Sequence, residues 1–116
     1  MTMMTIFCLT AARGILTTTP QNVLVLRGQD AFLNCSTRDL STSGQNPISW
    51  SYDQNIIIHQ PCTSGNAGFV AISDLATDCN IRALSSYEYG ISGAYRCDYP
   101  PSRAVATVVV LGEKHH

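Results

Sequence analysis

Charged side chains are scarce in this chain of 116 residues, which is long enough for one domain with a modest core. Lys, Arg, Asp and Glu make up 13% of the residues, and the net charge is −1. This is roughly half of the charged share that is usual in soluble domains. Because no basic field exists to attract phosphate backbones, nucleic-acid binding is not expected.

Catalytic and membrane-spanning patterns are missing as well. The sequence contains neither a G-x-S-x-G nor an H-E-x-x-H motif, and no run reaches the roughly 18 apolar residues of a membrane span. The only lysine, Lys114, stands before His115 and His116, so residues 113–116 are interpreted as a linker and the start of a purification tag. His59 is then the one remaining histidine, and no nucleophile motif includes it. The sequence predicts a protein that is not an enzyme and that needs no cofactor and no metal.

Cysteine, in contrast, is abundant, and five cysteines in a chain of this size favour an oxidising, extracellular compartment. The odd number leaves one cysteine over, and Cys8 is the candidate because its surroundings resemble a domain least. Residues 1–17 are interpreted as an N-terminal extension or as the remainder of a secretory leader. The stretch up to Arg13 is apolar and rich in small residues but lacks the basic start of a complete leader, so both interpretations stay open.

Short strand-like segments separated by turn residues fill residues 18–112. The expected strands cover residues 23–26, 31–35, 48–53, 56–58, 69–72, 79–83, 93–99 and 104–111. Turn signals recur about every 8–12 residues, and no segment keeps a helical period. The sequence therefore predicts an all-β fold of two packed sheets.

Four residues form the most informative pattern in the chain. Cys35 and Cys97 are 62 positions apart, the only tryptophan, Trp50, lies between them, and Tyr95 precedes the second cysteine by two positions. The pattern predicts a disulfide that joins two sheets, an indole packed on that bridge, and a tyrosine that holds the corner before the second cysteine.

With these residues in place, the chain resembles a domain of the immunoglobulin superfamily over residues 18–112. The resemblance also includes Gly28 in the turn before the first cysteine strand, the Ser-Gly-x-Tyr-x-Cys run of residues 92–97, and the strand 104–111 followed by Gly112. It implies a two-sheet antiparallel β-sandwich of Greek-key topology. The isoleucine-rich segment 56–58, taken as an additional strand, indicates the variable-like type.

Two departures from the family pattern narrow this expectation. Ile91 stands where variable or intermediate domains usually carry an aspartate, and residues 69–75 contain no arginine to pair with one. The loss of both partners is consistent, because removal of one alone would leave a buried charge unpaired. The last strand also lacks the Phe-Gly-x-Gly motif of joining segments, which disfavours a rearranging antigen receptor.

A second pair of cysteines, Cys62 and Cys79, is additional to the family pattern. A disulfide between them would close a short loop and would stabilise the fold by roughly 3 kcal/mol in the chain-entropy model. A zinc site with His59 as third ligand is the competing interpretation, although the C-x-x-C spacing of such sites is missing. Free thiols are the third.

Two expected strands are apolar on both faces, which is the clearest functional indication. Alternation turns Ala106 and Val108 inward and leaves Val105, Thr107 and Val109 facing outward. In variable-type domains the segment 56–58 belongs to the same sheet and must expose at least one isoleucine. The candidate interface residues are Ile56, Ile57, Ile58, Ser49, Ser51, Arg96, Asp98, Val105, Thr107 and Val109. Exposed apolar patches with a polar rim mark interaction surfaces; the alternatives are that β-branched residues simply form strands well or that the N-terminal segment covers them.

The resemblance and the apolar face together predict an extracellular recognition or adhesion module of an immune-type or cell-adhesion receptor. It would bind another protein or itself, as a homodimer or in a homophilic contact, and would be a plasma-membrane ectodomain or secreted. The alternative is a secreted defence protein that binds a microbial glycan or surface ligand through loops 36–47 and 99–103, with Tyr52, Tyr99 and Arg103 as contact groups. A pathogen-encoded copy of a host adhesion domain is a third interpretation.

One modification motif is present. Asn34-Cys35-Ser36 fits the N-x-S pattern for N-glycosylation, and Asn34 is expected to point outward, opposite Cys35. Such tripeptides also arise by chance.

Overall fold

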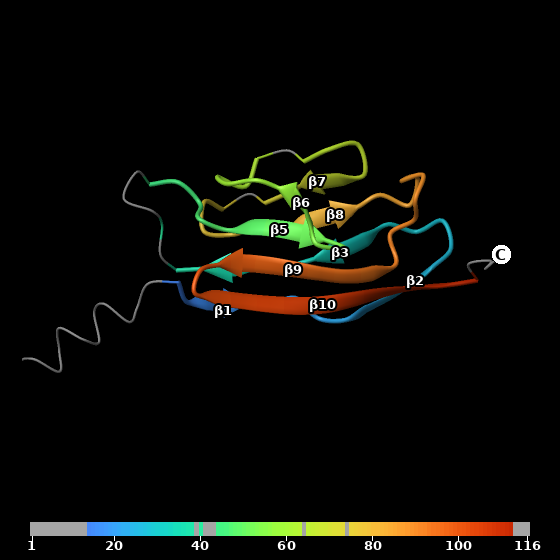
Figure 1. Ribbon diagram of the computed structural model, residues 1–116, viewed down its shortest axis with the longest axis horizontal. Helices are drawn as coiled ribbons and strands as arrows, with labels where there is room; N and C mark the ends of the chain where they lie inside the picture. The colour runs from blue at the N-terminus through green and yellow to red at the C-terminus, as the bar shows by residue number, and fades with distance from the viewer. Residues whose placement is uncertain (1–13, 39, 41–43, 64, 74, 113–116) are drawn as a thin grey trace, which may run out of the picture.

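The computed structural model describes residues 14–38, 40, 44–63, 65–73 and 75–112, and each of the elements in these ranges is a β-strand (Figure 1). The strands are β1 (Leu16–Thr18), β2 (Val23–Leu26), β3 (Ala31–Leu33), β4 (Ser36–Thr37), β5 (Ser49–Tyr52), β6 (Asn55–Ile58), β7 (Phe69–Ala71), β8 (Ile81–Ala83), β9 (Gly93–Tyr99) and β10 (Ser102–Leu111).

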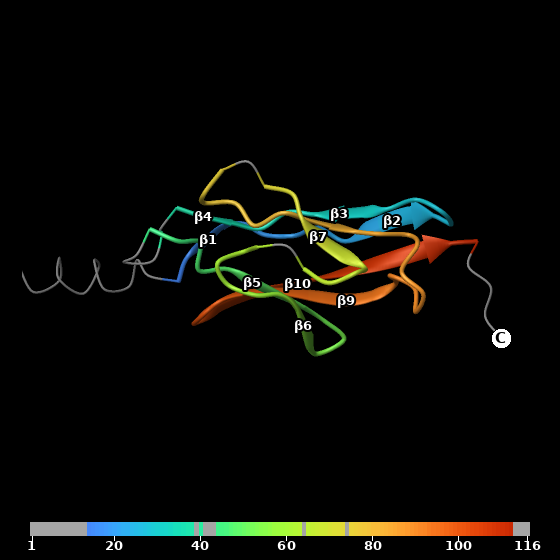
Figure 2. The same cartoon turned by 90° about the horizontal axis from the view of Figure 1, so that it is seen from above.

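The strands form two layers, as Figure 2 shows from above. One layer is a five-stranded sheet in the order β2-β10-β9-β5-β6. The other contains the three-stranded sheet β3-β8-β7 together with the short pair β1-β4. All pairings are antiparallel except that of β2 with β10, which is parallel. The predicted all-β sandwich is confirmed.

The first described strand begins before residue 18, where the domain was expected to start. β1 begins at Leu16 and pairs with β4 in one layer, and after Pro20 the chain crosses to the other layer as β2. Gly14 is buried against the turn between β9 and β10, where a Cβ would lie 2.6 Å from Cδ of Pro101. Strand pairing therefore begins inside the segment that was expected to be an extension or leader. Residues 1–13 and 113–116, and with them Cys8 and the supposed tag, lie outside the described residues.

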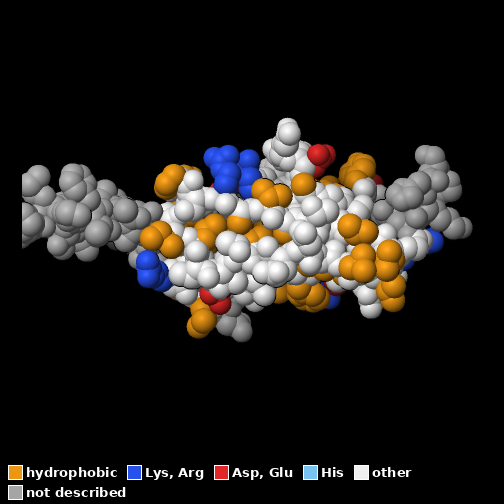
Figure 3. Space-filling model, turned by 90° about the horizontal axis from the view of Figure 1, so that it is seen from below, with side chains coloured by type: hydrophobic (Ala, Val, Ile, Leu, Met, Phe, Trp, Pro, Cys, Tyr) orange, Lys and Arg blue, Asp and Glu red, His pale blue; other side chains and the backbone are white. Residues whose placement is uncertain are grey.

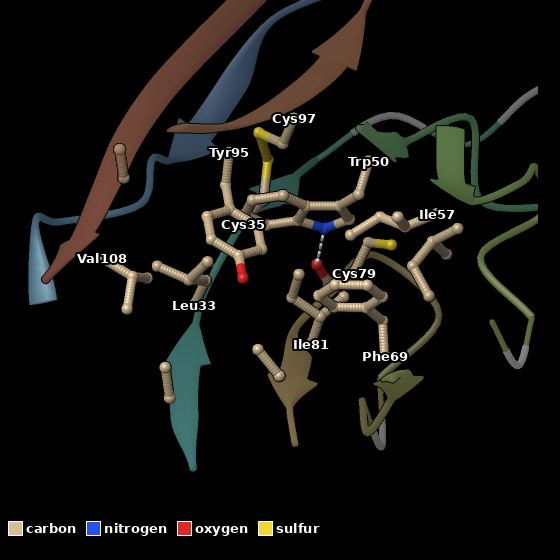
Figure 4. Close-up of a cluster of buried hydrophobic side chains, with 14 of the residues drawn as sticks. Leu33, Cys35, Trp50, Ile57, Phe69, Cys79, Ile81, Tyr95, Cys97 and Val108 are labelled. Atoms are coloured by element: carbon tan, nitrogen blue, oxygen red, sulfur yellow. Dashed lines mark hydrogen bonds between the residues drawn. A yellow bond between two sulfur atoms is a disulfide. The ribbon is translucent and has the colours of Figure 1, made fainter. Parts of the chain in front are cut away.

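The core is organised around the first disulfide, as the sequence predicts (Figure 4). Cys35 and Cys97 are bonded at 2.02 Å, and the fully buried indole of Trp50 lies beside them. The backbone of Cys79 connects the two: its N–H donates to the carbonyl of Cys35 at 2.7 Å, and its carbonyl accepts from Nε1 of Trp50 at 2.6 Å. The central bridge and the tryptophan are thus both held by one residue of the second cysteine pair.

The tyrosine corner is also present. The buried hydroxyl of Tyr95 donates to the carbonyl of Ile91 at 2.6 Å, and the Tyr95 ring stacks on that of Tyr52 with 4.5 Å between the centroids. Ile91 itself is buried, so this position holds an apolar side chain in a place where an unpaired carboxylate would be costly.

Alkaline pH should destabilise the fold through Tyr95. Burial raises the pKa of its hydroxyl well above the ordinary value of 10.0. The folded form therefore stays protonated while the unfolded form ionises, and the free energy of unfolding should fall by about 1.4 kcal/mol per pH unit above pH 10 from this residue alone. We expect urea unfolding between pH 9 and about pH 11.5 to follow a shallower pH dependence in Tyr95→Phe than in the wild type. Equal slopes would mean that the hydroxyl ionises in the folded protein.

The five-stranded sheet carries one additional edge strand, β6. Variable-type immunoglobulin domains have two strands at this place, between the strand with the tryptophan and the next strand of the opposite sheet. In the described part of the chain, β6 alone lies between β5 and β7. It is joined to β5 by Asp53 and Gln54, which both have positive φ, at 50° and 68°.

Candidate interaction face

The outer face of the five-stranded sheet is apolar along β10. Ala106 and Val108 point into the core, and Val105, Val109 and Leu111 are exposed, in the alternation expected of a strand. Thr107 lies between them and is also exposed.

β2 extends this apolar surface by two leucines, whose outward direction the sequence alone does not indicate. The parallel register places Leu24 opposite Val109 and Leu26 opposite Leu111, and both leucines are exposed. Residues opposite each other in neighbouring strands point to the same face of a sheet, so the four side chains lie together. With Val105 they form what we call the apolar stripe. Figure 3 shows hydrophobic side chains gathered at the end of the molecule next to the C-terminus, where β2 and β10 end.

Two of the expected interface residues, Ile57 and Ile58, are not on this face. Their exposed fractions are 5% and 0%, and both belong to the core. A register shift between β5 and β6 explains this, because Trp50 is opposite Ile58 whereas Ser51 is opposite Ile56. An irregularity of this kind breaks the alternation of a strand, so that two successive isoleucines point inward. Their inclusion in the interface was wrong. Ser51 is also only 5% exposed, but its pairing with Arg96 places it on the outer face.

Ile56 is exposed and remains at the outer edge of the face. It ends a row of residues that face each other across four strands, from Val105 through Arg96 and Ser51. The apolar stripe therefore lies at one edge of the sheet and Ile56 at the other, with Arg96 between them. The half-buried Ser49 lies next to this row, opposite Asp98.

The charged residues of the face form one cluster. Asp98 is bound by Nε of Arg96 at 2.8 Å and approached by Nε of Arg103 at 3.8 Å. Both arginine side chains are about half exposed or more, so the pairs add little stability. Their effect is to hold charges of both signs beside the stripe.

The residues expected to form a loop site are not gathered in one place. Tyr99 and Arg103 lie on either side of the turn between β9 and β10. Tyr52 pairs instead with Tyr95 further along β9, and its hydroxyl donates to the carbonyl of Ser92 at 2.6 Å. The turn therefore does not bring Tyr52 together with Tyr99 and Arg103 in one contact site.

The second cysteine pair forms a disulfide, as one of the three interpretations predicted. Cys62 and Cys79 are bonded at 2.03 Å. The bond connects the segment that follows β6 with the segment that leads into β8. The bond occupies both thiols that a zinc site with the exposed His59 would need. Among the described residues, no group of three or more His, Cys, Asp or Glu side chains is placed to hold a metal ion.

Asn34 lies on the opposite layer of the sandwich. Its side chain is exposed next to the end of β3, as expected, and away from the apolar stripe. Glycosylation at this position stays a prediction. Within the described ranges no helix is long and apolar enough to cross a membrane.

Comparisons with known proteins establish the fold. No protein-family model and no curated protein matches the sequence. Domain I81 of titin matches in structure with a TM-score of 0.60 and 18% identity, over 83% of this chain and 94% of that one. The N-terminal Ig1-2 module of the Drosophila receptor protein tyrosine phosphatase DLAR matches with a TM-score of 0.65 and 16% identity, over 90% of this chain and 52% of that one. At such identities the likeness concerns the fold, which is the immunoglobulin-like β-sandwich.

Proposed function

We propose that this chain is an extracellular protein–protein recognition module that docks through the outer face of its five-stranded sheet, with a second copy of itself as partner. The observation that carries the proposal is the apolar stripe of Leu24, Leu26, Val105, Val109 and Leu111, all exposed on one face. The two disulfides support an oxidising compartment, where the module would belong to a cell-surface adhesion or immune-type receptor or to a secreted protein.

Strand formation alone does not account for the stripe. β-branched residues are favoured in strands whether or not they bind anything, but three of the five residues of the stripe are leucines. The opposite layer shows the contrast, because there the exposed ring of Phe32 is covered in part by the guanidinium of Arg82, 5.7 Å from its centroid. β2 lies beside β10 in the sheet instead of over its outer face, so it enlarges the stripe and does not cover it.

A second copy fits this face because the face is self-complementary. In a two-fold contact the same surface is used on both molecules. The stripe contains no charged side chain, so two copies of it would not repel each other. Asp98 and its arginines Arg96 and Arg103 give each copy both signs of charge, which allows reciprocal pairing at the rim to set the orientation.

Leu24→Glu tests the proposal, with Leu75→Glu as the matched control. Both leucines are 64% exposed, but Leu75 lies in the loop between β7 and β8, outside the stripe. We expect sedimentation to show self-association of the wild type and of Leu75→Glu, and a dissociation constant about a hundredfold higher in Leu24→Glu, because a carboxylate would be desolvated at the contact. Circular dichroism checks that all three are folded. Identical sedimentation of the three proteins, as monomers or as dimers, would refute the homodimer through this stripe.

A further inference from the structure

We infer that a second, separate binding site, specific for neutral carbohydrate, lies at the turn between β5 and β6 beside the ring of Tyr89. A hollow of about 390 Å³ opens there, a size within the range of small-molecule sites. It is lined by Tyr52, Asp53, Asn55, Asn66, Tyr87 and Tyr89, among others. None of these residues belongs to the apolar stripe, and the inference does not depend on the proposed self-association.

Tyr89 provides an apolar surface that is both exposed and held in place. It is 78% exposed, yet its ring contacts that of Tyr87 edge to face, with 5.5 Å between the centroids. Tyr87 in turn packs against the buried Phe69 at 4.9 Å. The π-face of an aromatic ring is electron-rich and attracts the weakly positive C–H groups of an apolar surface. One face of a sugar ring consists of such groups, which makes an anchored tyrosine a suitable platform for it.

The loop before β7 positions the inner ring and one amide together. A Cβ on Gly68 would lie 2.2 Å from Cδ1 of Tyr87, so that the ring rests directly on the backbone. The N–H of Gly68 also donates to Oδ1 of Asn66 at 3.3 Å. The glycine therefore sets the place of an aromatic ring and of a polar side chain that both line the hollow.

The polar groups across the hollow suit hydroxyl groups. Asp53 offers a carboxylate that only accepts hydrogen bonds, and Asn55 and Asn66 offer amides that both donate and accept. Sugar hydroxyls do both as well. A local hydrogen bond orients each amide. Nδ2 of Asn55 donates to the carbonyl of Asp53 at 3.1 Å, and Oδ1 of Asn66 accepts from the N–H of Gly68.

The backbone of the turn supports a functional role. Asp53 and Gln54 have φ of 50° and 68° in a two-residue hairpin turn. Aspartate is common at positive φ in such turns, whereas glutamine is strained there. Non-glycine residues in this region are found at sites where the side chain is needed. At this turn the strained Gln54 directly follows Asp53, which lines the hollow.

A second hollow that shares Tyr87 and Tyr89 with the first indicates an extended ligand. This hollow, of about 420 Å³, is also lined by Tyr87 and Tyr89 and contains Arg27 and Glu88. An oligosaccharide could lie across the Tyr89 ring with a sugar unit in each hollow. Asp53 would repel an acidic sugar in the first hollow, and the second hollow contains one charge of each sign, Arg27 and Glu88, so neutral sugars suit both hollows and we assign neutral ones.

The test is binding of the purified protein to an array of neutral oligosaccharides, namely glucans, mannans, galactans and N-acetylglucosamine oligomers, followed by titration of any ligand found. Tyr89→Ala and Asp53→Asn should each weaken binding about tenfold or more, as expected for loss of an aromatic or charged contact. Tyr99→Ala, at the opposite end of β9, and Leu24→Glu, in the stripe, should bind like the wild type.

Two results would overturn the inference: no binding of the wild type to any of these glycans at millimolar concentration, or equal binding of the wild type and a folded Tyr89→Ala variant. If Tyr89→Ala instead abolished self-association in sedimentation, the ring would belong to a protein contact. A failure of Leu24→Glu to dissociate the dimer would bear on the proposed function alone.

Discussion

Replacing Cys35 and Cys97 together by alanine should lower the free energy of unfolding by about 4 kcal/mol, and replacing Cys62 and Cys79 together should lower it by about 3 kcal/mol. The pairs are separated by 62 and 17 residues, and the longer closed loop restricts the unfolded chain more strongly. Since domains of this size are stable by only about 5–15 kcal/mol, the first variant should be close to unfolding at physiological temperature.

Urea unfolding of the two double variants, measured side by side, gives this order. The backbone bonds of Cys79 to Cys35 and Trp50 use main-chain atoms, so alanine at position 79 retains them and the comparison concerns the bridges. A larger loss from the Cys62 and Cys79 pair would contradict the loop argument. It would mean that the shorter bridge is what holds Cys79 in position for both bonds.

Trp50→Ala should cost about 4 kcal/mol of unfolding free energy. The indole is fully buried, and removing so large a side chain leaves a cavity that the sandwich cannot close. The change also leaves the Cys79 carbonyl without its donor at 2.6 Å. Trp50→Phe retains much of the volume and isolates the second effect, for which we expect about 2 kcal/mol, the cost of one unpaired buried acceptor.

Tyr89→Ala is the control for these measurements. It also removes an aromatic ring, but one that is mostly exposed, so its cost should stay within about 0.5 kcal/mol. Chemical denaturation of the three variants with the disulfides intact provides the comparison. A Trp50→Phe variant as stable as the wild type would show that the indole N–H adds nothing to the core.

The parts of the fold that follow from side-chain chemistry could be predicted from the sequence. Cys35, Trp50, Tyr95 and Cys97 indicate a particular sandwich because each has a fixed partner in it, and the alternation along residues 104–111 indicates which side faces the core. The bridge from Cys62 was one of the open interpretations for the same reason, since a cysteine in an oxidising compartment has few other partners.

The parts that depend on strand register could not be predicted in this way. The inward direction of Ile57 and Ile58 results from an irregularity between β5 and β6, and three successive isoleucines carry no pattern that would reveal it. Leu24 and Leu26 alternate with two valines, so either face of β2 could have been the inner one until its pairing with β10 was known. β1 is only three residues long and shows no alternation of its own.

The parallel pairing of β2 with β10 also determines how the domain would respond to mechanical tension. The chain enters the sandwich at one end and leaves it at the other (Figure 1), and the two strands run side by side in the same direction. A pull on the ends would slide them along each other in shear and would load the hydrogen bonds between them together instead of one after another. Residues 35–97 are closed by a disulfide and could not lengthen, so that even a ruptured domain would extend only by the segments outside this loop.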